Sequence, residues 1–245
     1  MPVATKLRRF IPSYGGKRSI AAKYPKPVHA QIIEPFAGGA GYSLEYPDHP
    51  VHLMDLDERV CGVWDYLIHA TEADILSIPV DIQDVSEIPP RRHGDEVRWL
   101  VGWWMSPAAA SGPATRSYTW GKQHAGRSDV WGEKCRDRLA QQVHAIRHWT
   151  VEQGSYESLD IDRLATWFVD PPYEVKGKHY HHSTLDYKAL AIWCRSLNGQ
   201  VIVCENEGAD WLPFTKLCDF VSGQKPIRGP GNGGGKRTVE MIWTS

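Results

Sequence analysis

The chain has 245 residues, a formal net charge of −1 and 42% hydrophobic residues. These values fit a soluble protein with a sizeable core and give no overall sign of a polyanionic partner; five cysteines without a C-x-x-C pair favour reduced, mostly buried thiols over a disulfide framework. With no apolar run of membrane-spanning length and no signal peptide at the basic start, we expect a cytoplasmic protein.

Residues 1–30 are basic and contain a glycine-rich turn. Tyr14 is followed by Gly15 and Gly16, which let a backbone approach a ligand closely, and then by Lys17, which can meet an anionic group. Taken alone, this pattern favours a plain surface turn. Residues 18–24 are expected to form a short helix that ends before Pro25.

A second glycine-rich turn follows the first predicted strand, residues 31–33. The segment 34–43 reads Glu-Pro-Phe-Ala-Gly-Gly-Ala-Gly-Tyr-Ser, which predicts a strand end, a turn that admits a ligand, and then a helix. The spacing matches neither the dinucleotide fingerprint nor a P-loop. Because Glu34 would repel a phosphate, a ligand with a cationic centre fits this turn better.

Acidic residues close the second predicted strand, residues 51–54. Asp55 lies about 20 positions past the glycine-rich turn, where an acid commonly binds ribose hydroxyls. For Asp57 and Glu58 we favour helix N-capping. A helix over 58–77 should follow, because Val60, Val63, Trp64, Leu67 and Ile68 share one face.

Residues 78–148 suggest a basic, aromatic and loop-rich insertion, with helices expected at 97–105 and 131–149. Between 111 and 149 there are seven Lys or Arg residues against three acids, with Tyr118, Trp120 and Trp131 interleaved. This composition suits contact with nucleic acid. A solvated loop backed by a basic helix accounts for it equally well.

The tetrapeptide Asp170-Pro171-Pro172-Tyr173 is the strongest candidate site. After a strand at 149–151, the apolar run 165–169 predicts a buried strand, and open α/β sheets bind ligands at the carboxyl ends of such strands. The two prolines extend the backbone and remove N–H donors, so carbonyl acceptors lie beside a carboxylate and a ring. That set fits a flat molecule with an NH2 group, such as a nucleobase. The alternative is an Asp-Pro turn with a packed tyrosine.

The remainder of the chain is expected to complete the sheet. A polar loop at 174–183 contains Lys176, Lys178 and three histidines, but it lacks a fourth ligand at suitable spacing, so we expect no metal. A helix at 186–197, a buried strand at 200–204, a glycine-rich stretch at 229–235 and a final strand at 238–243 follow.

The order of these motifs resembles the Dam-type DNA adenine methyltransferases, especially their phage-borne relatives. The resemblance rests on Tyr14 to Lys17, Glu34 to Gly39, Asp55 after a strand, the basic region and the tetrapeptide, and it covers nearly the whole chain. It implies an α/β fold with a Rossmann-like, doubly wound, mostly parallel sheet and an antiparallel terminal hairpin. Residues 1–77 and 149–245 would form the catalytic domain, and 78–148 an inserted target-recognition region.

The resemblance also implies roles for single residues. S-adenosyl-L-methionine would be the methyl donor, and double-stranded DNA the partner, without an obligate protein partner, in a bacterial or phage-infected cell. The implied donor-site residues are Tyr14, Lys17, Glu34, Phe36, Ala37, Gly38, Gly39, Asp55 and Asp170. The implied DNA contacts are Arg116, Lys122, Arg127, Lys176 and Lys178. One departure is Ser155, which stands where the family often has an acid that contacts the donor's adenine ring.

The implied chemistry explains the catalytic set Asp170, Pro171, Pro172 and Tyr173. Asp170 and the Pro171 carbonyl would accept the two hydrogens of an exocyclic amine, which localises its lone pair and aims it at the methyl sulfonium. Tyr173 would stack on a base that has left the duplex. Methylation of cytosine N4 needs the same acceptors, and methylation of RNA or a non-catalytic DNA-binding role remain alternatives. Methylation of protein glutamine is disfavoured, because that group usually begins its tetrapeptide with Asn.

Overall fold

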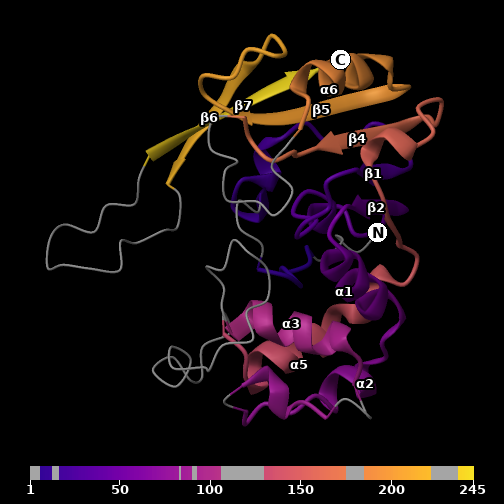
Figure 1. Ribbon diagram of the computed structural model, residues 1–245, viewed down its shortest axis with the longest axis vertical. Helices are drawn as coiled ribbons and strands as arrows, with labels where there is room; N and C mark the ends of the chain where they lie inside the picture. The colour runs from indigo at the N-terminus through magenta and orange to yellow at the C-terminus, as the bar shows by residue number, and fades with distance from the viewer. Residues whose placement is uncertain are drawn as a thin grey trace, which may run out of the picture.

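A computed structural model describes residues 6–12, 17–82, 84–89, 93–105, 130–174, 185–221 and 237–245. In these ranges the protein is an α/β structure built on one seven-stranded sheet (Figure 1). The strand order is β3-β2-β1-β4-β5-β7-β6. The strands are β1 Ile32–Glu34, β2 Val51–Asp55, β3 Thr150–Gln153, β4 Ala165–Val169, β5 Gly199–Asn206, β6 Thr215–Val221 and β7 Arg237–Thr244.

The sheet is mostly parallel, as predicted. Strands β1 to β5 run parallel to one another, whereas β7 is antiparallel to both β5 and β6. The β6–β7 pair is an antiparallel strand pair, as the resemblance implied. The position of β6 itself was not predicted: it is a half-exposed strand at the sheet edge with charged side chains and an irregular register between Lys216 and Cys218, so it lacks the apolar run of a central strand.

In the described ranges the helices differ from their predictions in four places. The short helix expected over 18–24 is two 3₁₀ turns, at Lys17–Ser19 and Ala21–Lys23. The helices are α1 Glu58–His69, α2 Glu72–Leu76, α3 Asp95–Met105, α5 Glu133–Gln142 and α6 Tyr187–Ser196. The single helix expected over 58–77 is two helices, because Ala70 is extended and Thr71 forms a capping box with Asp74 at the start of α2. The helix expected over 131–149 starts after Gly132 and tightens to a 3₁₀ turn at Val143–Ile146.

The prediction of a helix after the second glycine-rich turn is wrong. Within the described stretch 17–82, this place holds only a 3₁₀ turn at Ser43–Glu45. Ala40 has a φ of +47°, in the left-handed region, and the Ser43 amide donates to the Glu34 carboxylate at 2.8 Å. Both features take the backbone out of the repeating helical hydrogen-bond pattern.

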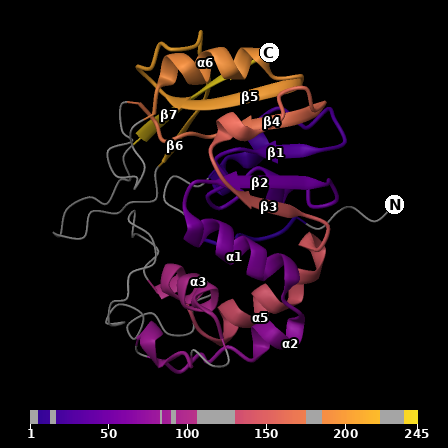
Figure 2. The same cartoon turned by 45° about the vertical axis from the view of Figure 1, so that its right-hand side comes forward.

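Two hydrophobic layers cover the two faces of the sheet, which matches the doubly wound prediction. Alternate residues of each strand point to opposite faces. On one face Phe168 and Ile202 share a core with Trp64 of α1; on the other Trp167 and Val201 share a core with the buried side of α6. Figure 2 shows α1 and α6 on either side of the strands.

Helices α2, α3 and α5 gather beyond α1 (Figures 1 and 2). Trp104 of α3 and Leu139 of α5 belong to the same hydrophobic core as Trp64 of α1. The approach of α3 to α1 is close, because a Cβ added at Gly62 would lie 2.9 Å from the Trp99 ring. The insertion boundaries at 78 and 148 stay a prediction.

All five cysteines are free thiols, and four of them are buried, as the sequence suggested. None of the helices in the described ranges combines the length and the apolar character that crossing a membrane requires.

Candidate functional site

The candidate site lies where the strand order reverses. From β1 the sheet continues through β2 to β3, and from its neighbour β4 it continues through β5 in the opposite direction. Ligands of open α/β sheets bind in the crevice outside the carboxyl ends of the strands at such a point. Glu34 ends β1, Asp55 ends β2, and Asp170 directly follows β4.

Asp170 is paired with a lysine that comes from the first glycine-rich turn. The Lys17 Nζ lies 2.9 Å from the Asp170 Oδ1 and 4.4 Å from the centroid of the Tyr173 ring. The Lys17 side chain is 6% exposed and that of Asp170 is 21% exposed. The structure thus brings together three residues that the sequence placed in the site, from segments about 150 positions apart in the chain.

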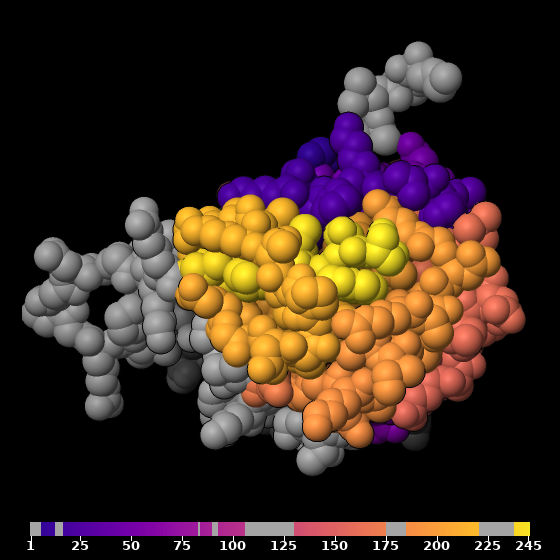
Figure 3. Space-filling model, turned by 90° about the horizontal axis from the view of Figure 1, so that it is seen from above, coloured from indigo at the N-terminus to yellow at the C-terminus, as the bar shows by residue number. Residues whose placement is uncertain are grey.

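Glu240 on β7 is a site residue that the sequence analysis missed. It is fully buried, and its Oε1 accepts hydrogen bonds from the hydroxyls of Tyr24 and Tyr173, both at 2.6 Å. The same oxygen is 3.8 Å from the Lys17 Nζ. The available signal was a lone acid inside the terminal strand, because a buried carboxylate requires partners. In Figure 3 the yellow β7 lies between the indigo N-terminal residues and the orange segment that includes β5.

Burial shifts the protonation of this cluster. It raises the pKa of Asp170 and of Glu240, and in both cases the Lys17 ammonium is the main opposing influence. Burial and the neighbouring carboxylates also raise the pKa of the Tyr173 phenol, which therefore stays a hydrogen-bond donor. Two carboxyl groups therefore lie beside one buried ammonium.

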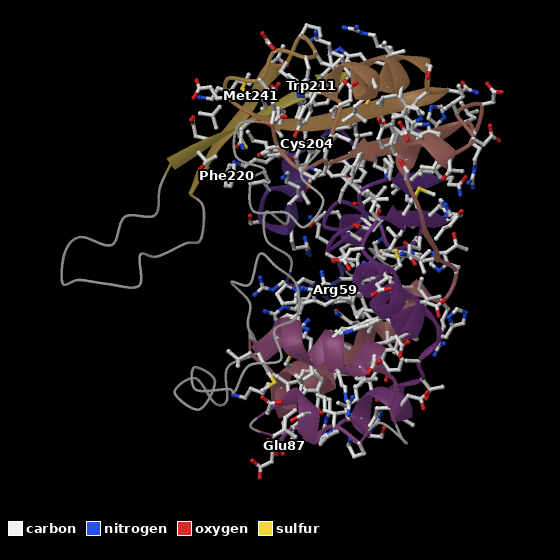
Figure 4. The ribbon with its side chains drawn as sticks, in the orientation of Figure 1. Arg59, Glu87, Cys204, Trp211, Phe220 and Met241 are labelled. Atoms are coloured by element: carbon white, nitrogen blue, oxygen red, sulfur yellow. The ribbon has the colours of Figure 1, made fainter. Side chains whose placement is uncertain are left out.

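The backbone at Pro172 and Glu174 is held by side chains of α6 and β5. The Tyr187 hydroxyl donates to the Pro172 carbonyl at 2.7 Å. Glu205, near the end of β5, accepts from the Glu174 amide at 3.2 Å and from the Trp211 indole at 3.0 Å through the same oxygen, Oε2. In Figure 4 Trp211 and Cys204 lie at the β5 end of the molecule, far from Glu87. The tetrapeptide is therefore held on a fixed scaffold.

Asp55 and the second glycine-rich turn form one unit. The Asp55 carboxylate accepts from the Gly38 amide and from the Asp57 amide, both at 3.0 Å, and the Trp64 indole donates to the Gly38 carbonyl at 2.9 Å. Gly38 has a φ of +42°, and a Cβ added there would meet nothing within 4 Å. The turn therefore needs glycine for its backbone conformation and faces open space. Asp57 caps α1, as predicted.

Phe36 and Tyr156 flank this unit. Their ring centroids are 5.5 Å apart, and the Gly154 amide donates to the Asp55 carbonyl at 3.0 Å. Ser155 donates from its hydroxyl to the Glu157 carboxylate at 3.2 Å. An acid, Glu157, therefore stands two residues after Ser155, within hydrogen-bond distance of its hydroxyl.

Glu34 ends β1 with a buried carboxyl group that Ser43 holds by two hydrogen bonds. Its side chain is buried, and its Oε1 accepts from the Ser43 amide at 2.8 Å and from the Ser43 hydroxyl at 2.5 Å. Burial raises its pKa to about 8, although the bonds from Ser43 oppose the shift. Near neutral pH the neutral form of Glu34 is therefore favoured.

The Glu34→Gln variant should change how stability depends on pH. Between the ordinary pKa of 4.5 and the raised value of about 8, the unfolded chain loses the Glu34 proton while the folded chain keeps it, so the free energy of unfolding falls as pH rises through this window. Glu34→Gln removes that loss, which is on the order of a few kcal/mol at alkaline pH, since each pKa unit corresponds to about 1.4 kcal/mol. Urea unfolding at several pH values measures it.

Glu207→Gln, at an exposed acid near the end of β5, is the control for this experiment. The stability difference between Glu34→Gln and wild type should grow with pH, whereas the difference for Glu207→Gln should stay constant. A constant difference for Glu34→Gln would show that Glu34 ionises in the folded protein at its ordinary pKa.

Several predicted site residues lie outside the described residues. These are Tyr14, Arg116, Lys122, Arg127, Lys176 and Lys178. Phe36, Ala37, Gly38 and Gly39 all lie in the turn above β1, next to Asp55. Within the described ranges, no group of His, Cys, Asp and Glu side chains is arranged to hold a metal ion.

Comparisons with known proteins identify no family for this chain. No protein-family model matches the chain, and no curated protein matches it.

Proposed function

We propose that the protein is an S-adenosyl-L-methionine-dependent DNA methyltransferase that acts on the exocyclic N6 amine of adenine. One observation carries the proposal: Asp170, at the switch point of the sheet, holds a nitrogen donor 2.9 Å from its carboxylate, beside the Tyr173 ring. An acceptor of this kind can bind the N–H of an exocyclic amine. The order of the sequence motifs supports the choice of adenine.

The residues present fit the proposed donor. Asp170 and Glu240 are two carboxyl groups beside the one ammonium of Lys17, and such a surrounding suits a sulfonium and an α-amino group. The open turn at Gly38 lets a ligand approach the backbone. The Asp55 carboxylate closes β2 beside the Gly38 turn, where it would bind the ribose hydroxyls of the donor. When bound, the donor supplies a methyl group on a positively charged sulfur.

The residues of the chain would position the amine rather than react covalently. Asp170 and the Pro171 carbonyl accept its two hydrogens, which keeps the nitrogen lone pair out of the ring and directed at the methyl carbon. The nitrogen would form the new bond to the methyl carbon while the methyl–sulfur bond breaks and its electron pair stays on the sulfur. The Asp170 carboxylate would take the proton that the nitrogen loses. The extruded base stacks on Tyr173, at a cost of a few kcal/mol for leaving the duplex.

Incubation with donor and unmethylated DNA tests the proposal. We expect N6-methyladenine in the nucleoside digest by mass spectrometry, and single-molecule sequencing then gives the recognised site. Detection of N4-methylcytosine instead would show that the target is cytosine, because the amines of both bases need the same acceptors. If the protein binds the donor and DNA but no methylated base is found, the protein is a non-catalytic DNA-binding protein.

A further inference from the structure

The Lys17 ammonium holds two contacts that the substrate amine would use. It donates to the Asp170 carboxylate at 2.9 Å and covers one face of the Tyr173 ring at 4.4 Å. If the proposed function holds, the amine of the target base binds Asp170 and the base stacks on Tyr173. Lys17 must then give up its place on Asp170 when the base enters.

A buried ammonium that leaves one carboxylate needs another, because an unpaired charge inside a protein is strongly destabilising. Glu240 meets this requirement. It is fully buried, and the Lys17 Nζ lies 3.8 Å from its Oε1. A change of side-chain torsion in Lys17 suffices to move the ammonium from one carboxylate to the other without moving the backbone.

Glu240 also has unused acceptor capacity. Its Oε1 binds the Tyr24 and Tyr173 hydroxyls, whereas its Oε2, equally buried, has no hydrogen-bond partner among the described residues. The two tyrosine bonds fix the orientation of the carboxylate and join it to the ring that stacks on the base. A bound carboxylate with one open oxygen is suited to receive a cation.

We propose that Glu240 is a positioning residue that receives the Lys17 ammonium when the substrate amine takes the ammonium's place on Asp170. This inference rests on the proposed function. It assigns to β7 a part in base binding: Lys17 protects the acceptor while no base is bound, and Glu240 holds Lys17 away while the base is bound.

A double-mutant cycle between positions 17 and 240 tests the inference on a duplex that contains the recognised site. Glu240→Gln keeps the size and an acceptor for the tyrosines but removes the charge, so we expect the KM for DNA to rise about tenfold, the cost of one charge-assisted contact. Lys17→Met removes the ammonium that has to be displaced, so it lowers the KM for DNA while weakening donor binding. The double variant should match Lys17→Met in its KM for DNA.

Glu205→Gln is the matched control. Glu205 is also a fully buried carboxylate in the antiparallel β5–β7 pair, but its partners are Asn206, Glu174 and Trp211. Its effect on the KM for DNA should be the same whether residue 17 is Lys or Met. If Glu240→Gln also changes the KM for DNA by the same factor whether residue 17 is Lys or Met, Glu240 does not act through Lys17. The inference is then wrong.

A binding experiment separates this inference from the proposed function. The nitrogen NMR signal of the Lys17 ammonium, identified by its loss in Lys17→Met, should shift when single-stranded oligodeoxyadenylate is added. The matching oligomer of purine deoxyriboside, which lacks the amine, should leave it in place. Absence of methyl transfer in the wild type would refute the proposed function alone. A Lys17 signal that responds in the same way to both oligomers would refute the inference.

Discussion

Asp170→Ala should abolish methyl transfer, with kcat/KM falling at least about 10³-fold, as expected when a preorganised polar group is removed from the reacting centre. The substitution deletes the carboxylate that would accept the amine hydrogen and leaves the amine lone pair delocalised in the ring. Donor binding should largely survive, because Asp55 and the Gly38 turn hold each other and do not depend on Asp170. Transfer of labelled methyl to DNA and calorimetry with the donor measure the two effects separately.

Two further variants make this test specific. Asp170→Asn keeps the shape and one acceptor oxygen, so it should retain more activity than Asp170→Ala. Asp160→Ala, at an exposed acid between β3 and β4, should leave transfer at the wild-type rate. Full activity in Asp170→Ala would show that another group accepts the amine and would remove the basis of the proposed function.

Trp64→Ala should lower the free energy of unfolding by about 3–5 kcal/mol, the usual cost of truncating a large buried aromatic side chain. Trp64 is fully buried in α1 and packs against the rings of Phe10 and Trp149, with centroids 5.9 Å away in both cases. Chemical denaturation measures the loss. The finer variant Trp64→Phe keeps most of the packing and removes the indole N–H that donates to the Gly38 carbonyl.

Trp64→Phe can be compared with a matched bond elsewhere. Trp167 is also fully buried, and its indole donates to the Asn198 carbonyl at 2.9 Å, the distance between Trp64 and Gly38. Trp64→Phe and Trp167→Phe should cost similar stability, about 1 kcal/mol for one hydrogen bond. Only Trp64→Phe should weaken donor binding, because only Trp64 holds the turn. Equal donor affinities in the two variants would show that the turn does not need its indole bond.

The central strands were predictable because each is a short apolar run that ends at a turn signal. The run at 165–169 is fully buried, as its composition required. The edge strand β6 has no such run, since half of its surface faces solvent. The absence of a helix after the second glycine-rich turn depends on the bond between Ser43 and Glu34 and on the left-handed Ala40, neither of which has a signature in the local pattern.

The site was predictable where its parts belong to single motifs. Asp170 and Tyr173 lie three residues apart in one turn, and Asp55 follows the strand next to the glycine-rich turn, so sheet geometry alone brings each set together. Glu240 and Tyr24 meet only because β7 pairs with β5 in one register, and a slip by one residue would turn Glu240 to the other face of the sheet. A single sequence does not reveal that register.

The place of β7 between β5 and β6 affects the order in which the site is made during synthesis. The ribosome produces β6 before β7, yet in the finished sheet β6 is bonded only to β7, so β6 has no sheet partner until the later strand has emerged. Of the described residues in the Lys17 cluster, Glu240 is the last to be translated. A nascent chain can therefore hold Lys17 on Asp170 before it has a second carboxylate to offer, and the switch between the two is completed only when β7 joins the sheet.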